Sequence, residues 1–253
     1  MHLLPLLIPV APDGAVAPSG VANDTLLAWI ICILAAYLAG SIPFGVMLGR
    51  LRGINIREHG SRNVGATNVA RVLGKRLGGL CFALDVLKGA VPVLVAGIVN
   101  DVVDRAVTQL THAEMWLWLA VAAAAVAGHM FSMFLKFAGG KGVATGFGAM
   151  LAMWPPLTVP AVMAFVVWFT ALRMWRYVGL ASVLAALSLP ILVIIWNMPA
   201  SGNLHETLHV WPMIVSTGVL AAVVVWKHRG NLARIRRGEE PKITGMARRG
   251  GVQ

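Results

Sequence analysis

Long apolar runs alternate with short polar segments along the chain. Seven of these runs approach or exceed the roughly 20 residues that a helix needs to cross the hydrocarbon core of a bilayer. They cover residues 24–49, 77–99, 114–135, 142–156, 157–173, 178–197 and 210–226. The pattern therefore predicts an all-α integral membrane protein with about seven transmembrane helices.

The fourth run differs from the others because it is short and interrupted by glycine. It ends at Trp154-Pro155-Pro156, so we expect it to cross the membrane among other helices rather than against lipid. Residues 1–22 are apolar but broken by proline and glycine, which predicts a poorly ordered N-terminal extension. Residues 23–240 predict a single transmembrane domain, and residues 241–253 predict a basic C-terminal tail.

Basic residues gather on one side of the predicted bundle. Of the 21 Lys and Arg residues, all except Arg105 and Lys88 fall after the first, third and fifth runs or after the last one. Cytoplasmic loops of membrane proteins carry an excess of Lys and Arg. The distribution predicts an odd number of crossings, with the N-terminus outside and the C-terminus in the cytoplasm.

The composition supports a membrane protein without a cofactor. The chain is 58% hydrophobic and only 12% charged, whereas a soluble domain carries about a quarter charged residues. Cys32 and Cys81 lie inside apolar runs, and the scattered histidines match no metal-binding spacing, so we expect neither a disulfide nor a metal. The net charge of +11 predicts attraction of the cytoplasmic face to anionic membrane lipids, and nucleic acid is not an expected partner.

A glycine turn follows the third run, within the stretch Gly128–Thr145. Gly139, Gly140 and Gly142 surround Lys141, and a predicted helix begins directly afterwards. Exposed backbone amides, a helix N-terminus and a lysine together favour a phosphate-like anion. A flexible loop whose lysine only marks the cytoplasmic side is an equally good interpretation of the turn by itself.

The loop at residues 56–71 is a second candidate binding segment, because it is more polar than a plain connector needs to be. Neutral hydrogen-bonding side chains stand beside three arginines in this loop: Ser61, Asn63, Thr67 and Asn68 with Arg57, Arg62 and Arg71. Arginine binds phosphate in a bidentate manner, and hydroxyl and amide groups suit a polyol. The loop is therefore predicted to bind a ligand that carries both.

Two further polar pairs lie in or beside apolar runs. Asp85 and Lys88 are three residues apart, on one face of a predicted helix, and we expect a structural ion pair before a functional role. His228 and Asn231 have the same spacing after the last run. A histidine at that place is more often an interfacial polar residue than a functional one.

Five motifs in one order carry a resemblance to a known family. They are Gly40-Ser41-Ile42-Pro43-Phe44-Gly45, the loop Gly60–Arg71, Asp85-Val86-Leu87-Lys88-Gly89, the stretch Gly128–Thr145, and His228-Arg229-Gly230-Asn231. Over about residues 30 to 240 the chain resembles the bacterial acyl-phosphate:glycerol-3-phosphate acyltransferases, the PlsY family. The resemblance implies seven membrane helices in the bacterial inner membrane, with an active site that faces the cytoplasm.

The resemblance also implies a reaction and a set of site residues. An acyl group moves from an acyl phosphate to the 1-hydroxyl of glycerol 3-phosphate, giving lysophosphatidic acid and phosphate, the first step of phospholipid synthesis. By analogy, the substrates are held by Ser61, Arg71, Lys141, Ser182, His228 and Asn231, with phosphate contacts from Gly139, Gly140, Gly142, Asn63, Thr67 and Asn68. Neither His228 nor the substrate phosphate is assigned as the base. An enzyme that makes acyl phosphate is a potential partner that hands over this substrate.

Two positions depart from the family pattern. Arg62 stands where the family loop has its second glycine, which changes how closely the backbone approaches substrate, although the arginine itself could contact phosphate. Gly179 stands where a serine is common, which leaves Ser182 as the hydroxyl of that segment.

Other functional classes fit the sequence less well. The His-x4-Asp signature of larger acyltransferases and the nucleotide-binding P-loop are both absent from the sequence. A transporter of anionic metabolites would place its polar motifs near the membrane midplane, whereas these motifs cluster at one surface. A regulatory or scaffolding membrane protein would leave the polar loop unexplained, so the sequence favours an enzyme.

Overall fold

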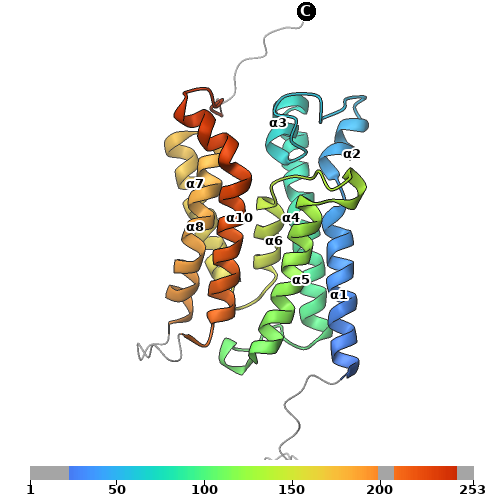
Figure 1. Ribbon diagram of the computed structural model, residues 1–253, viewed down its shortest axis with the longest axis vertical. Coiled ribbons are helices and arrows are strands. Elements are labelled where there is room, and N and C mark those ends of the chain that lie inside the picture. The colour runs from blue at the N-terminus through green and yellow to red at the C-terminus, as the bar shows by residue number, and fades with distance from the viewer. Residues whose placement is uncertain (1–22, 199–207, 244–253) are drawn as a thin grey trace, which may run out of the picture.

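The computed structural model describes residues 23–198 and 208–243, and all regular secondary structure in these ranges is helical (Figure 1). The α-helices are α1 Asn23–Ser41, α2 Phe44–Arg50, α3 Ala66–Leu73, α4 Lys75–Val99, α5 His112–Met130, α6 Val143–Leu151, α7 Thr158–Trp175, α8 Val178–Asn197 and α10 Trp211–Arg236. Two short 3-10 helices, η1 Val107–Gln109 and η2 Met133–Leu135, lie in the connections. The predicted N-terminal extension and residues 244–253 of the predicted tail lie outside the described residues.

Six segments of the described chain are long and apolar enough to cross a membrane. They are Thr25–Arg50, Lys75–Val99, His112–Leu135, Thr158–Trp175, Val178–Asn197 and Trp211–Arg236. Their outward faces carry large apolar side chains such as Leu34, Ile98 and Ile191, each more than half exposed. Such a continuous apolar surface suits a lipid environment, and the predicted all-α integral membrane class is confirmed.

The prediction of about seven transmembrane helices exceeds the six long apolar segments of the described chain, and the fourth run accounts for the difference. There α6 has nine residues and rises only about 14 Å, less than half of the roughly 30 Å hydrocarbon core. The helix ends before Trp154-Pro155-Pro156, because proline cannot supply the backbone donor that a continuing helix requires. It packs against α4 and α5 instead of standing alone.

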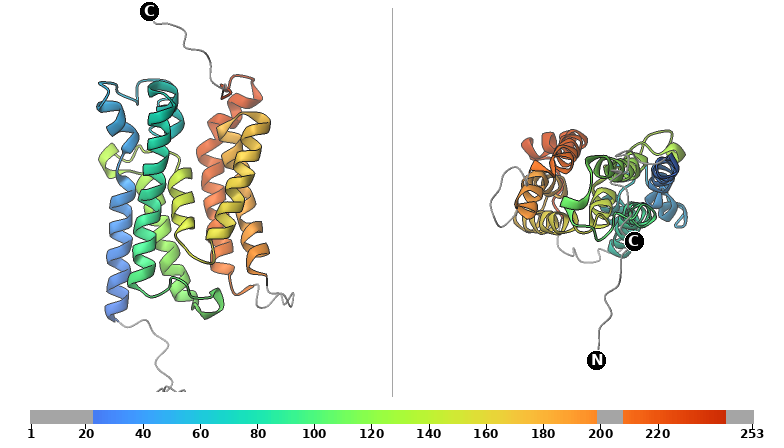
Figure 2. Two further views of the ribbon diagram at one scale, coloured as in Figure 1. Left: turned by 180° about the vertical axis from the view of Figure 1, so that it is seen from behind. Right: turned by 90° about the horizontal axis from the view of Figure 1, so that it is seen from below.

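The helices form two groups that are visible from both sides of the molecule (Figures 1 and 2). The first group contains α1, α4, α5 and α6, and the second contains α7, α8 and α10. Contacts of α6 with α7 and of α5 with α10 join the two groups. The beginning of α1 and the end of α10 lie at opposite ends of the bundle, and α2 and α3 lie at the same end as the end of α10 (Figure 1).

Glycine makes the close packing within the first group possible. A Cβ atom on Gly128 of α5 would overlap the backbone oxygen of Tyr37 in α1, and one on Gly148 of α6 would overlap that of Val86 in α4. Helix association in membranes depends on such small residues, because lipid supplies no hydrophobic driving force between helices. These contacts hold α4, α5 and α6 in the positions from which the site is built.

A break separates α1 from α2 within the first predicted span. Pro43 precedes α2 and donates no backbone hydrogen bond, which leaves carbonyl groups of the preceding turn without helical partners. Lys88 Nζ donates to the backbone oxygen of Ile42 at 2.7 Å, and Ser132 Oγ donates to that of Ser41 at 2.6 Å. Side chains from α4 and from the segment after α5 thus satisfy the broken turn.

Candidate active site

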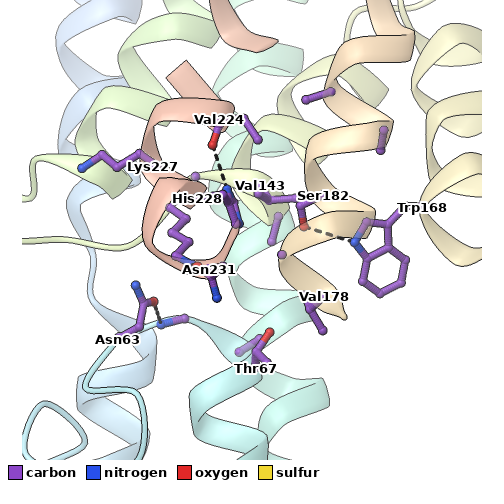
Figure 3. A pocket seen from close by; sticks show the side chains of 18 of the residues that line it. Asn63, Thr67, Val143, Trp168, Val178, Ser182, Val224, Lys227, His228 and Asn231 are labelled. Atoms are coloured by element: carbon purple, nitrogen blue, oxygen red, sulfur yellow. Dashed lines mark hydrogen bonds between the residues drawn. The ribbon is translucent and has the colours of Figure 1, made fainter. Parts of the chain in front are cut away.

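A cavity of about 850 Å³ opens between the two helix groups at the end of the bundle where α3 lies (Figure 3). All the residues predicted to form the site line it, except Gly139 and Gly140. The predicted residues in its wall are Ser61, Asn63, Thr67, Asn68, Arg71, Lys141, Gly142, Ser182, His228 and Asn231. Segments that are more than 160 residues apart along the chain therefore meet at one cavity.

The polar loop owes its shape to Asn68, which is only 1% exposed. Its side-chain nitrogen lies within hydrogen-bond distance of the backbone oxygens of Ile56, His59 and Asn63, at 3.2, 3.0 and 2.9 Å. Its side-chain oxygen accepts the Ser61 N–H at 2.8 Å. Because these bonds engage both ends of the amide, Asn68 organises the loop.

The ordered loop presents its remaining polar groups to the cavity. Asn63 Oδ1 accepts the N–H of Gly65, the residue that precedes α3, at 2.8 Å. Thr67 and Arg71 then lie on α3 at a spacing of four residues, so both point from one helix face. Asn63 and Thr67 line the same cavity as Asn231 of α10 (Figure 3). Hydroxyl, amide and guanidinium groups therefore meet at this end of the cavity.

The glycine turn places Lys141 in the cavity wall between the two helix groups. Its ammonium group donates to Asn231 Oδ1. Burial lowers the pKa of Lys141 to about 8, since the nearby Glu240 carboxylate, which raises this pKa, does not offset the loss of water. Gly142 then adopts a φ of 79°, a left-handed conformation that suits glycine, and α6 begins at the next residue.

Two backbone amides of the turn differ from the prediction. The N–H of Gly139 donates to the oxygen of Met130 at 3.2 Å, and the N–H of Gly140 donates to that of His129 at 3.0 Å. These amides are engaged and lie away from the cavity, so the predicted phosphate contacts from Gly139 and Gly140 are corrected. For the amides of residues 142–145, by contrast, the described part of the chain offers no acceptor. The N-terminus of α6 is therefore the part of this turn that can bind an anion.

The end of α10 supplies a buried histidine and an amide. His228, 3% exposed, has its Nδ1 2.8 Å from the backbone oxygen of Val224 (Figure 3). A proton on Nδ1 makes that bond and leaves Nε2 as an acceptor. Asn231 donates to Glu240 Oε1 at 2.6 Å, while its oxygen accepts from Lys141. Both ends of the Asn231 amide are thus fixed.

Glu240 is a site residue that sequence reasoning missed. Its carboxylate also accepts from Arg234 Nε at 2.6 Å and lines the cavity. The chain reaches this position by folding back after α10, where Ile243 exchanges two hydrogen bonds with Arg176. The only sequence signal is an acidic pair in an otherwise basic tail, and the predicted boundary at 240–241 placed it at the edge of the domain.

The other half of the cavity is apolar. Ser182 Oγ accepts the indole N–H of Trp168 at 3.3 Å (Figure 3). Aromatic and aliphatic side chains form the rest of this part of the wall. They include Phe147, Phe165, Leu189 and Leu220. A cavity that joins a cationic end to an apolar end can bind a ligand with an anionic head and a hydrocarbon chain.

Comparison with known proteins agrees with this amphipathic site. The sequence model of a family described as "Glycerol-3-phosphate acyltransferase" matches residues 30–238. The chain is 41% identical over 219 residues to a glycerol-3-phosphate acyltransferase of Trichlorobacter lovleyi, covering 86% of this chain and 99% of the relative. It is 42% identical over 211 residues to one of Geotalea daltonii, covering 83% and 95%. The chain belongs to the glycerol-3-phosphate acyltransferase family.

Solved structures of a glycerol 3-phosphate acyltransferase match the fold of this chain as well. A crystal structure of PlsY (YgiH), an integral membrane glycerol 3-phosphate acyltransferase in its glycerol 3-phosphate form, is 34% identical, with a TM-score of 0.70, and covers 88% of this chain and 96% of that one. Its lysophosphatidic acid form matches with the same identity and TM-score. The resemblance to PlsY is thereby confirmed: this acyltransferase is an enzyme that acylates glycerol 3-phosphate to lysophosphatidic acid.

The two departures from the family pattern have different structural settings in this acyltransferase. Arg62 has a φ of 58°, and its side chain is exposed and is not among the residues of the cavity wall. Gly179 of α8 lies against Asn231 of α10. A Cβ atom there would come within 2.9 Å of the Asn231 Cβ. Glycine at position 179 therefore leaves room for Asn231 in the acyltransferase site.

The expected ion pair within α4 is confirmed. Lys88 Nζ lies 2.8 Å from Asp85 Oδ1, and both side chains are buried. A third member was not predicted, because its contact comes from another helix: His129 Nδ1 of α5 lies 3.6 Å from the same carboxylate oxygen. Asp85 and His129 both belong to the cavity wall of the acyltransferase.

Proposed function

We propose that this enzyme takes its acyl group from an acyl phosphate and transfers it to the 1-hydroxyl of glycerol 3-phosphate. The hydroxyl oxygen bonds to the acyl carbonyl carbon, the bond from that carbon to the phosphate oxygen breaks, and inorganic phosphate departs with the hydroxyl proton. An acyl phosphate is already activated, so orientation and charge stabilisation are the main tasks of the protein. One observation carries this assignment: the cavity joins a cationic, amide-lined end to an apolar end.

Each end of the cavity receives one part of the substrates in this proposal. The phosphates bind near Lys141, Arg71 and the N-terminus of α6, where charge and backbone amides attract anions. Ser61, Asn63 and Thr67 offer hydrogen bonds to the glycerol backbone. His228 lies between these two sets, Asn231 anchors Lys141 beside it, and the apolar half beyond Ser182 holds the acyl chain.

Charge stabilisation in the reaction depends mainly on Lys141 in this proposal. Its ammonium group is anchored by Asn231, and Lys141 stands two residues before the start of α6. The departing phosphate gains negative charge as the bond to the acyl carbon breaks, and a fixed cation in a partly buried site stabilises that charge strongly. The Lys141→Ala variant should therefore lose about 100-fold or more in turnover.

The experiment measures release of inorganic phosphate by the purified protein, given palmitoyl phosphate and glycerol 3-phosphate in detergent or a lipid mesophase. Release should require both substrates and accompany formation of lysophosphatidic acid, whereas acyl-CoA and acyl carrier protein donors should be inactive. The matched control is Lys136→Ala, which removes an exposed lysine from the same segment and should retain activity within about twofold. Near-normal turnover in folded Lys141→Ala, or turnover with acyl-CoA instead of acyl phosphate, would reject the proposal.

We also propose an orientation in the bacterial inner membrane. The cavity faces the cytoplasm, the N-terminus lies outside, and α6 together with the segment up to residue 157 makes a seventh pass. The distribution of Lys and Arg along the sequence supports this orientation. A C-terminal green fluorescent protein fusion should fluoresce and a C-terminal alkaline phosphatase fusion should be inactive; the opposite pair of results would reverse the orientation.

A further inference from the structure

The glycine turn that carries Lys141 rests directly on one residue of α5, His129. Its backbone oxygen accepts the N–H of Gly140 at 3.0 Å. Its ring lies against the same glycine, since a Cβ atom on Gly140 would overlap the ring Nε2. A Cβ atom on Gly139 would overlap the backbone oxygen of His129 as well. The two residues before Lys141 are thus pressed against both the ring and the backbone of His129.

On its other side, the His129 ring meets a buried charged pair. Its Nδ1 lies 3.6 Å from Asp85 Oδ1, the oxygen that Lys88 Nζ approaches to 2.8 Å. The Lys88 ammonium group also donates to the backbone oxygen of Ile42 at 2.7 Å. Asp85, Lys88 and His129 are each less than 10% exposed. Asp85 and Lys88 compensate each other's buried charge, so removal of either would leave the other uncompensated.

The two sets of contacts connect the packed interior to the site. The break between α1 and α2, the ion pair of α4 and the end of α5 meet at His129, and the next contact outward is the turn that places Lys141. A lysine side chain has a flexible four-carbon stem, so its ammonium group can reach many positions unless the backbone of the same residue is fixed. A misplacement of about 1 Å in a reacting arrangement can cost about 100-fold in rate.

We propose that His129, packed between the Asp85–Lys88 ion pair and the glycine turn, is a positioning residue that fixes this turn and so places the Lys141 ammonium group for the reaction. His129 acts through Lys141 and does not itself exchange a proton with the substrates. This inference rests on the proposed role of Lys141. It assigns a function to a histidine and an ion pair that the proposed reaction does not otherwise use.

A double-mutant cycle tests the inference with kcat and KM for glycerol 3-phosphate. His129→Ala should lower kcat/KM by about 10- to 100-fold. The loss should be divided between kcat and KM in the same way as the loss caused by Lys141→Ala. In the Lys141→Ala background the same substitution should change kcat/KM by less than about threefold, because residues that act as a unit are not additive. Independent, multiplicative losses would overturn the inference, as would near-normal activity of His129→Ala.

Further variants separate positioning from a general effect on folding. His129→Gln fills most of the space of the ring and keeps a polar end, so it should recover most of the activity that His129→Ala loses. If His129→Ala does not fold, His129→Gln serves in its place: its smaller loss should also disappear in the Lys141→Ala background, and persistence of that loss would overturn the inference. His112→Ala, at the exposed first residue of the same helix, is the matched control and should remain active.

The outcome also distinguishes the inference from the proposal on which it depends. Normal activity of folded Lys141→Ala would reject the role of Lys141 itself. A large loss in Lys141→Ala with an unchanged His129→Ala would leave that role intact and reject only the positioning by His129. Thermal unfolding in detergent, measured for every variant, ensures that only folded samples are compared.

Discussion

The protonation state of Lys141 should set the alkaline limit of the enzyme. Burial lowers its pKa to about 8, so the ammonium form is the major one at pH 7 and the minor one at pH 9. The second ionisation of a phosphate monoester lies near pH 6, so the charge of glycerol 3-phosphate is nearly constant over this interval. If only the ammonium form binds and stabilises phosphate, kcat/KM should fall by about tenfold between pH 7 and pH 9.

The direction of this change follows from the physical causes of the pKa shift. Loss of water around Lys141 disfavours its charged form, the Glu240 carboxylate favours it, and the Arg234 guanidinium disfavours it. Glu240→Gln removes the favourable charge, so the decline in kcat/KM should begin at a lower pH. A bound phosphate supplies a new negative charge, and the pH profile of kcat, which reports the enzyme–substrate complex, should therefore decline at a higher pH than that of kcat/KM.

Initial rates of phosphate release at glycerol 3-phosphate concentrations well below KM measure kcat/KM directly. Rates without enzyme are subtracted at each pH, because acyl phosphates hydrolyse spontaneously. Lys141→Arg is the informative variant: its guanidinium stays charged throughout the range, so its remaining activity should not decline between pH 7 and pH 9. A flat profile for the unaltered enzyme, or the same decline in Lys141→Arg, would show that Lys141 does not control the alkaline limit.

Two further predictions concern stability and are measured by thermal unfolding in detergent. Gly148→Ala should destabilise the protein by about 1–3 kcal/mol, because its Cβ atom would overlap the oxygen of Val86; Gly218→Ala, which faces open space, should not, and equal effects would contradict the close packing of α4 and α6. Arg62→Gly should stabilise it by about 0.5–1 kcal/mol, because glycine adopts a φ of 58° without a Cβ penalty. An unchanged or lower unfolding temperature would contradict the second prediction, and Arg57→Gly is its matched control.

The transmembrane organisation could be predicted from the sequence because it depends on local properties. A bilayer leaves no water for backbone groups, so a long apolar segment must form a helix whatever its neighbours are. The segments Lys75–Val99 and Val178–Asn197 agree closely with two predicted runs. The exception, α6, also has a local cause, because glycine and the paired prolines shorten it, but the run was long enough in sequence to be counted with the others.

The chemistry of the site could be predicted as a set of residues but not as an arrangement. The sequence contained the lysine between glycines, the polar loop and the pair after the last run, and the motifs of the family linked them. It did not show that Asn68 turns inward to hold the loop, or that the amides of Gly139 and Gly140 are already engaged. A polar side chain that faces ligand and one that supports the loop have the same appearance in sequence.

Only the tertiary structure decided which of these groups meet. Lys141 and Asn231 are 90 residues apart, and their hydrogen bond exists because α6 and α10 approach each other at the same end of the bundle. His129 joins Asp85 from a different helix, and Glu240 reaches Asn231 only after the chain folds back. Hydrophobicity acts along a single segment and can be recognised there. Hydrogen bonds and ion pairs act over about 3 Å, so their partners are determined only when distant segments have packed together.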